Sequence, residues 1–189
     1  ALLLGPWVAA ATGLGLALAW AYSAPPLRLK MNGWWGNSAV AISYEGLAWI
    51  TGAAIVIGGD LPAQPILLIA LLYSIGAHGI MTLNDFKSVE GDLTMGIRSL
   101  PAQLGPTRAA RVACLFMLLP QLIVILLLVR WGLMPFALAV SLVVVAQLLA
   151  MRKLLRDPKQ FAPWYNATGV SLYVLGMMAV AIGLGGWLM

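Results

Sequence analysis

Long apolar stretches dominate this chain and decide what it can fold into. Six of them are about 20 residues long, which is the length of helix needed to cross a hydrocarbon core about 30 Å thick. A segment inside lipid must satisfy its own backbone hydrogen bonds, so each stretch predicts a helix. The sequence therefore predicts an all-α, polytopic transmembrane bundle with six spans at about 2–22, 38–59, 63–83, 110–129, 132–151 and 167–188.

Charged residues are too scarce for a soluble protein. They make up 9% of the 189 residues, against about 25% in an ordinary soluble domain. Hydrophobic residues make up 62%, more than a chain of this length can hide from water in a core. The single cysteine, Cys114, excludes a disulfide framework within the chain. We therefore expect an integral protein of the lipid bilayer.

The basic residues predict which end of the bundle faces the cytoplasm. With six spans, the connections 23–37, 84–109 and 152–166 lie on one side of the membrane. Of the eleven Lys and Arg residues, all but Arg130 lie in or beside these connections. The positive-inside rule makes this side cytoplasmic and puts the C-terminus on the opposite side. Basic residues placed this way set topology rather than follow a phosphate backbone, so no nucleic-acid partner is expected.

The amino-terminal end of the chain is unusual. An apolar run starts at Ala1, without the basic segment or cleavage site of a signal peptide. In the predicted topology this start lies on the outer side of the membrane. We therefore expect further spans to precede Ala1, and we interpret the 189 residues as truncated at the N-terminus.

Half of the six acidic residues fall in one short segment after the third span. They are Asp85, Glu90 and Asp92. If the helix continues, Asp85 and Asp92 lie two turns apart on one face with Ser88 between them, and Glu90 points to the side. Two carboxylates on one face repel each other unless a cation lies between them. Mg²⁺ suits such a place, because it takes one or two carboxylates and completes its shell with phosphate and water.

Basic residues near these carboxylates suggest the chemistry. Lys87 and Arg98 flank the acidic pair, and Arg98 can neutralise a departing diphosphate through bidentate hydrogen bonds. Pro25-Pro26 ends the first span, so Arg28 and Lys30 face the same side of the membrane. These features predict metal-assisted loss of diphosphate from a lipid-soluble substrate. The alternative is a solvated loop whose charges only end a helix and mark topology.

Two ionisable residues lie inside predicted spans. An acid in hydrocarbon costs roughly 2.5–3.5 kcal/mol on insertion scales, so Glu45 should face the bundle interior or a substrate pocket. His78 lies seven residues before Asp85 and should share its face. His78 can bind substrate, ligate a metal or bond a neighbouring helix, and we favour the neighbouring helix.

Four motifs lie on the predicted cytoplasmic side: YSAPPLRLK at 22–30, NGWWGN at 32–37, LNDFKSVEGD at 83–92 and MGIRSLPAQLG at 95–105. Together they resemble the UbiA superfamily of intramembrane prenyltransferases, and most closely its (bacterio)chlorophyll synthase branch. The superfamily's second Asp-rich motif is usually acidic where this chain has Ser88, and serine is typical of that branch. Arg98 and His78 resemble bacteriochlorophyll synthases more than plant or cyanobacterial chlorophyll synthases. Met31 departs slightly from the family's pattern, in which glutamine is expected at this position.

The resemblance implies a fold of nine transmembrane helices around a central cavity. The six spans here correspond to the fourth to ninth of those helices. Residues 1–189 are then the C-terminal two thirds of a single prenyltransferase domain, without the first Asp-rich motif. Because that motif supplies the other half of a Mg²⁺–diphosphate site, the chain alone is expected to be inactive.

The resemblance also implies an activity. This is transfer of a prenyl group from geranylgeranyl or phytyl diphosphate to the propionate carboxylate of (bacterio)chlorophyllide, with Mg²⁺ as cofactor, in the plasma or photosynthetic membrane. Light-harvesting or reaction-centre assembly proteins are the implied partners. Carried over to this chain, the metal ligands are Asp85 and Asp92, with Asn84 and Glu90 in support. The diphosphate-binding residues are Arg28, Lys30 and Arg98, with Tyr22 as a hydrogen-bond donor and Lys87 close by.

Three alternatives remain open at this point. Another member of the superfamily would use a quinone or haem precursor as acceptor, and NGWWGN argues against that. A pigment-binding or assembly subunit would carry the same helices without turnover. A transporter needs coupling charges or broken helices near the midplane, and only Glu45 suggests one.

Overall fold

A computed structural model describes residues 2–187 as helices joined by short turns. Among these residues there is no strand, only one isolated bridge between Asn32 and Arg98. A π-helical turn, Ile42–Gly46, joins α2 to α3, and a 3-10 turn, Asp85–Lys87, follows α4. The helices are α1 (Pro6–Ser23), α2 (Gly33–Ala41), α3 (Leu47–Val56), α4 (Gln64–Asn84), α5 (Val89–Thr94), α6 (Leu100–Leu104), α7 (Pro106–Arg130), α8 (Met134–Arg156) and α9 (Pro158–Leu184).

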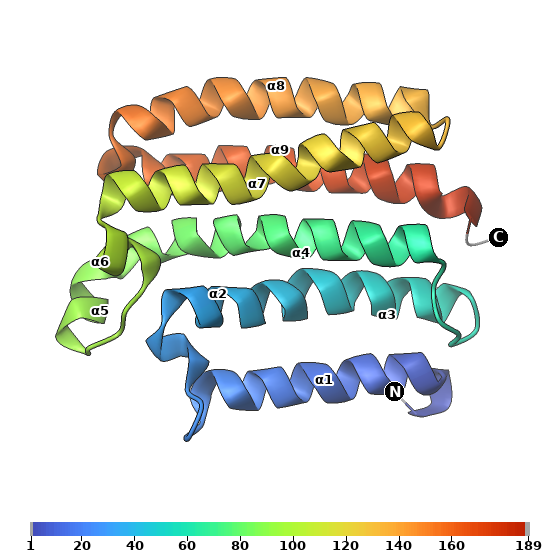
Figure 1. Cartoon of the computed structure of the whole chain (residues 1–189), viewed down its shortest axis with the longest axis horizontal. Helices are drawn as coiled ribbons and strands as arrows, with labels where there is room; N and C mark the ends of the chain where they lie inside the picture. Colours follow the sequence, from blue (N-terminus) through green and yellow to red (C-terminus); the bar gives the residue numbers. More distant parts are fainter. Residues whose placement is uncertain (1, 188–189) are drawn as a thin grey trace.

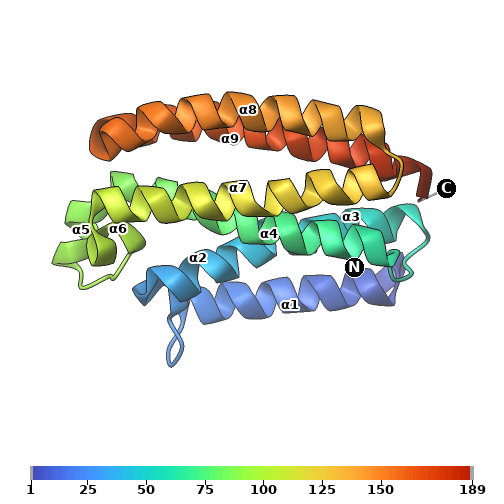
Figure 2. The same ribbon diagram turned by 45° about the horizontal axis from the view of Figure 1, so that its top comes forward.

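The long helices run side by side with α4 in the middle (Figures 1 and 2). Helix α4 packs against α2 and α3 on one side and against α7 and α9 on the other. Helix α8 packs on α7 and α9, and α1 packs mainly on α2 and α3. The start of α1 and the end of α9 lie at one end of the bundle (Figure 1). The other end, which we call the charged end, carries α5, α6 and the turn after α1 (Figure 1).

Five helical segments are long and apolar enough to cross a membrane, which confirms five of the six predicted spans. They are Gly33–Val56, Gln64–Lys87, Pro106–Arg130, Met134–Arg156 and Pro158–Leu184. The predicted span at 2–22 corresponds to α1, which has 18 residues and is not among the five. That α1 also crosses the membrane stays a prediction.

Three predicted connections are wrong in extent. Residues 33–37, 106–109 and 158–166 were expected in loops, but they form the starts of α2, α7 and α9. The Asn32 side chain caps α2 by accepting from the Trp34 amide at 2.9 Å. Asp157 caps α9 by accepting from the Gln160 amide at 3.2 Å, and Pro158 follows it. A capping residue fixes where a helix begins, and here that point precedes the apolar stretch. Hydropathy therefore marks the apolar part of each helix rather than its first residue.

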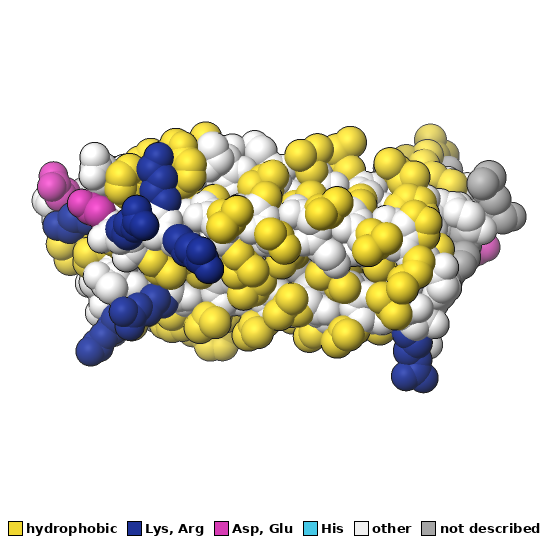
Figure 3. Space-filling view, turned by 90° about the horizontal axis from the view of Figure 1, so that it is seen from above, with side chains coloured by type: hydrophobic (Ala, Val, Ile, Leu, Met, Phe, Trp, Pro, Cys, Tyr) yellow, Lys and Arg dark blue, Asp and Glu magenta, His cyan; other side chains and the backbone are white. Residues whose placement is uncertain are grey.

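The charges follow the predicted division between the two ends. In Figure 3, dark blue and magenta side chains gather toward one end, and yellow apolar side chains cover most of the length between. Arg130 is the basic residue in the last turn of α7, at the opposite end of that helix from Arg108 and Arg111. The arrangement agrees with a transmembrane bundle. Which end faces the cytoplasm stays a prediction.

Candidate functional site

Asp85 and Asp92 line one small cleft at the charged end, with a volume of about 160 Å³. The continuous helix that was expected to align them is wrong, because α4 ends at Asn84 and α5 begins at Val89. The turn between the helices still brings both carboxylates to one place. Ser88 lies between them, as predicted, and its hydroxyl donates to Asp92 Oδ2 at 3.0 Å. Asp92 is only 7% exposed.

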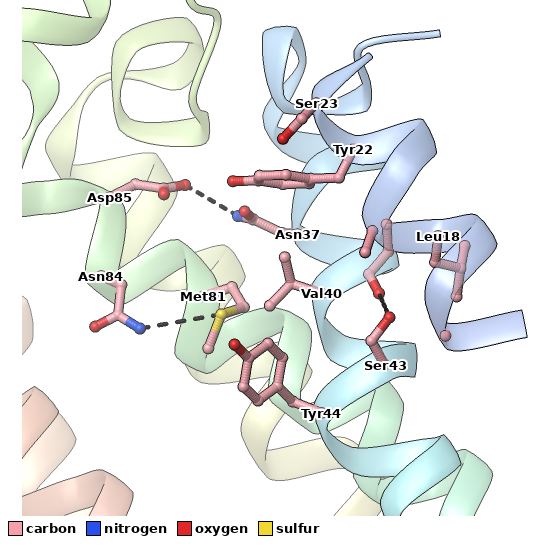
Figure 4. A pocket seen from close by; sticks show the side chains of 13 residues that line it. Leu18, Tyr22, Ser23, Asn37, Val40, Ser43, Tyr44, Met81, Asn84 and Asp85 are labelled. Atoms are coloured by element: carbon pink, nitrogen blue, oxygen red, sulfur yellow. Dashed lines mark hydrogen bonds between the residues drawn. The ribbon is translucent and has the colours of Figure 1, made fainter. Parts of the chain in front are cut away.

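Asn37 reaches the same carboxylates from α2. Its side-chain amide donates to Asp85 Oδ2 at 3.0 Å and to Thr82 Oγ1 at 3.4 Å. Because Asn37 is buried, its side-chain amide must find its hydrogen-bond partners within the protein. The bond fixes one Asp85 oxygen and ties α2 to the end of α4 (Figure 4).

The glycines of the NGWWGN motif build the wall of the cleft. A Cβ on Gly33 would lie 2.6 Å from the Leu100 backbone nitrogen, so only glycine lets α2 approach this segment. The Gly33 amide donates to the Arg98 carbonyl at 2.7 Å, and the Arg98 amide donates to the Met31 carbonyl at 3.0 Å. A Cβ on Gly36 would lie 3.2 Å from the Leu29 carbonyl oxygen. These contacts hold residues 29–31 and 98–100 together beside the carboxylates.

A larger cavity of about 700 Å³, the inner cavity, continues from the cleft along α1, α2 and α4. The two spaces share Tyr22, Asn37 and Asp85. Deeper in the membrane the inner cavity is lined by residues such as Leu18, Val40 and Met81. In Figure 4 the Tyr22 hydroxyl points toward Asp85 and Asn37. A polar cleft therefore opens into a chamber with largely apolar walls.

The cleft has the donor set of a magnesium site. Asp85, Asp92 and Ser88 bring oxygen atoms to it, and Lys30 brings a cation. The Ser99 hydroxyl, in a side chain 4% exposed, is buried without a hydrogen-bond partner. An orphaned hydroxyl beside two carboxylates fits an oxygen-liganded cation or a phosphate. Among the described residues no cluster of three His, Cys, Asp or Glu side chains occurs, and Mg²⁺ does not need one.

Several residues predicted for the site lie elsewhere. Glu90 and Lys87 line a separate surface cavity with Lys159, so the structure does not bring Glu90 to the two aspartates. Asn84 lines the inner cavity, where its Oδ1 already accepts from the Asn166 amide at 2.6 Å.

The charged groups of Arg28 and Arg98 are not placed in the cleft. Both side chains are exposed, and neither is among the residues that line the cleft. The Arg98 backbone forms part of the wall, as described above. Their contact with diphosphate stays a prediction.

Glu45 faces a different cavity from Asp85. It lies in the π-helical turn and lines a pocket of about 420 Å³ with Trp49, Ile66 and Met177. A membrane acid was expected to face a cavity, and it does. Because Glu45 and Asp85 line different cavities, contact of Glu45 with substrate stays a prediction.

His78 bonds a neighbouring helix, which is the role we favoured. Its Nδ1 lies 3.2 Å from Ser38 Oγ on α2, and its ring contacts Trp34 and Phe116 with centroid distances of 5.7 and 4.5 Å. The side chain is 3% exposed. The ring thus joins α2, α4 and α7 at the level of the cleft.

Sequence reasoning missed Asn37 and Ser99 as residues of the site. Both lie inside the motifs used for the family resemblance, at 32–37 and 95–105. A sequence signal existed for Asn37, because it is a polar residue directly beside the apolar stretch at 38–59. No comparable signal marked Ser99 as a residue of the site.

Comparisons with known proteins agree with this geometry. The sequence model of the UbiA prenyltransferase family matches residues 1–172. The chain is 56% identical over 184 residues to the bacteriochlorophyll synthase 33 kDa chain of Cereibacter sphaeroides, covering 97% of this chain and 61% of that protein. It is 50% identical to the 34 kDa chain of Chloroflexus aurantiacus, covering 97% and 58%. It is 38% identical to the chloroplastic chlorophyll synthase of Avena sativa, covering 89% and 44%.

A solved structure of digeranylgeranylglyceryl phosphate synthase has the same fold. It superposes with a TM-score of 0.75 at 18% identity, over 96% of this chain and 63% of that one. The chain thus spans about three fifths of the length of the curated bacterial relatives it matches.

Proposed function

Because the chain belongs to the UbiA prenyltransferase family, we propose that the whole protein is a bacteriochlorophyll synthase. The reaction is transfer of a geranylgeranyl or phytyl group from its diphosphate to the propionate carboxylate of (bacterio)chlorophyllide. Relatives named as bacteriochlorophyll synthases at 50–56% identity support this choice. One structural observation carries it: the acidic cleft and the inner cavity share three residues.

The cleft and the inner cavity suit the two halves of a prenyl diphosphate. The polar half belongs in the cleft, where Lys30 adds a cation beside Asp85 and Asp92. The apolar chain belongs in the inner cavity, whose volume of about 700 Å³ is in the range of pockets for small molecules. The diphosphate is then held at the membrane surface, and the carbon to which it is bonded lies near Tyr22 and Asn37.

Magnesium fits the cleft through oxygen ligands. Asp85 and Asp92 would hold the ion, with the Ser99 hydroxyl in reach of its water or of a phosphate oxygen. When bound, the ion neutralises the charge that builds up on a departing diphosphate. The chain's own contribution is orientation: Asn37 holds Asp85 and Ser88 holds Asp92 by hydrogen bonds of 3.0 Å each.

The acceptor carboxylate must meet the allylic carbon away from water. Leu18, Val40 and Met81 give that part of the inner cavity apolar walls, against which a prenyl chain displaces water. A carboxylate that attacks the allylic carbon there displaces the diphosphate, and no base is needed because the nucleophile is already ionised.

The test uses the full-length protein with geranylgeranyl diphosphate and bacteriochlorophyllide. Asp85→Asn and Asp92→Asn keep side-chain size but remove the charge that holds the ion, and each is expected to lower esterification by about a hundredfold or more. Asp60→Asn is the matched control, because Asp60 is exposed in the turn between α3 and α4. Chelation of Mg²⁺ should abolish product in the parent protein.

Chromatography of the products separates the acceptor classes. The proposal requires esterified pigment with bacteriochlorophyllide and no product with 4-hydroxybenzoate. Prenylated 4-hydroxybenzoate without pigment ester would instead make the protein a quinone-pathway member of the family. Unchanged rates in both aspartate variants would contradict the assignment of the cleft.

A further inference from the structure

A second groove is lined by residues of α7 and α8. These two helices lie on the side of the bundle away from α1 (Figures 1 and 2). The volume of the groove is about 530 Å³, and it shares no residue with the cleft or the inner cavity. It is lined by Arg111, Cys114, Leu115 and Leu118 of α7 and by Leu148, Met151, Arg152 and Leu155 of α8.

The long walls of this groove are apolar and open. Cys114 and Met151 are buried and form its floor, whereas Leu115 is 52% exposed and Leu148 is also exposed. Both helices are among the five segments apolar enough to cross a membrane. Exposed aliphatic side chains continue past the groove along α7 and α8, at Leu119, Leu122, Leu142 and Val145. An apolar face of this kind suits contact with the hydrocarbon of a bilayer.

Two arginines stand at the charged end of the groove, one from each helix. Arg111 lies near the start of α7 and Arg152 near the end of α8, so the antiparallel helices bring them to one level of the membrane. No acidic side chain lines the groove. Within residues 2–187, neither guanidinium has a hydrogen bond or ion pair. Figure 3 shows basic side chains gathered toward one end of this face, beside apolar ones.

We propose that this groove binds one anionic phospholipid. The phosphodiester accepts hydrogen bonds from Arg111 and Arg152, since guanidinium groups recognise phosphate in a bidentate way. One acyl chain runs down the groove past Leu115, Leu118 and Leu148. Basic pockets between transmembrane helices at the membrane surface are suited to such headgroups. The lipid comes from the leaflet that faces the charged end.

A second copy of the chain fits this groove less well. Two copies joined across it by a two-fold axis would bring four arginines together without an acidic partner, and like charges in a buried contact oppose association. A zwitterionic lipid is also disfavoured, because its ammonium group would lie beside the same two cations. Charge therefore selects an anionic lipid, independently of the proposed function.

The test measures lipid retention by the full-length protein. Protein is exchanged into detergent with phosphatidylglycerol or phosphatidylcholine, and bound lipid is counted by native mass spectrometry. We expect one retained phosphatidylglycerol, and an affinity at least about tenfold lower in Arg111→Gln/Arg152→Gln, since two charge-assisted hydrogen bonds are lost. Arg130→Gln is the matched control at the far end of α7 and should retain lipid like the parent.

A second variant fills the groove without touching the charge. Leu118→Trp is expected to lower phosphatidylglycerol retention as well. If the double arginine variant does not fold, this variant alone tests whether the groove binds the lipid. Equal retention by the parent and both variants would overturn the proposal. Retention of phosphatidylcholine equal to that of phosphatidylglycerol would also overturn it. A third contrary result is a dimer of the parent protein that dissociates in the double arginine variant without loss of bound lipid.

Discussion

The two faces of α4 are built in opposite ways. Toward α7 the helix is packed without space: a Cβ on Gly79 would lie 2.5 Å from the Ala113 carbonyl oxygen. Toward α1 and α2 the same helix borders the inner cavity through Met81, Asn84 and Asp85. The packed face fixes the position of α4, and the hollow face uses that fixed helix to hold the carboxylate. The difference shows that a rigid support and a binding space can share one helix.

The packed side also contains a buried polar pair. Gln121 of α7 and Gln147 of α8 exchange two amide hydrogen bonds of 3.1 and 2.9 Å, and both side chains are fully buried. In lipid such a pair specifies how two apolar helices align, because slippage leaves both amides unsatisfied. On the hollow side the buried Ser99 hydroxyl has no partner, and in the packed core the Tyr165 hydroxyl also has none.

Among variants that compare the two faces, Gly33→Ala on the hollow side is expected to have the largest effect. The new Cβ would press on the Leu100 backbone nitrogen and displace the segment that carries Ser99. A shift of about 1 Å in a site can lower a rate about a hundredfold, so kcat/KM for esterification should fall by about that factor. Gly36→Ala, whose nearest contact is 3.2 Å, should lose clearly less. Equal losses in the two variants would argue against the close approach at Gly33.

Gly79→Ala tests the packed face and should act on stability instead. Overpacking against the Ala113 backbone is expected to lower the free energy of unfolding by about 2 kcal/mol, measured by thermal or denaturant unfolding in detergent. Gly15→Ala is the control in a cavity wall, because its Cβ would meet only a leucine side chain at 3.6 Å. The contrast between the faces fails if Gly15→Ala destabilises as much as Gly79→Ala.

Removing one glutamine of the buried pair should cost more than removing both. Gln121→Leu leaves the Gln147 amide unsatisfied and is expected to lower the free energy of unfolding by about 1 kcal/mol. The double variant, with leucine at both positions, should recover most of that loss. A double-mutant cycle measured by unfolding gives the coupling directly, and additive losses would show that the two amides do not act as a pair.

The smallest expected effect is that of Tyr22→Phe in the hollow side. The hydroxyl points toward Asp85 and Asn37 (Figure 4), where it can donate to a bound diphosphate, and one hydrogen bond to the ligand is worth about threefold in binding. The KM for prenyl diphosphate should rise by about that factor while the unfolding temperature stays the same. Tyr44→Phe, farther along the same cavity, is the control.

The sequence alone determined that this is a bundle of transmembrane helices, and it located five of their apolar segments. It also singled out Asp85 and Asp92 as neighbours. These features are local: burial in lipid depends on the composition of each segment, and the two aspartates are only seven residues apart. The helix starts at Gly33 and Pro158 were missed, because a capping side chain rather than hydropathy decides them.

Only the tertiary structure decided which residues meet at the cleft. Asn37 is 48 residues from Asp85, and their contact depends on two glycines that let separate segments approach. The same packing placed Glu90 and Glu45 beside other cavities, although their charge made them candidates. Which helix faces come together depends on side-chain shape across the whole bundle, and hydropathy along one chain segment contains no information about that contact.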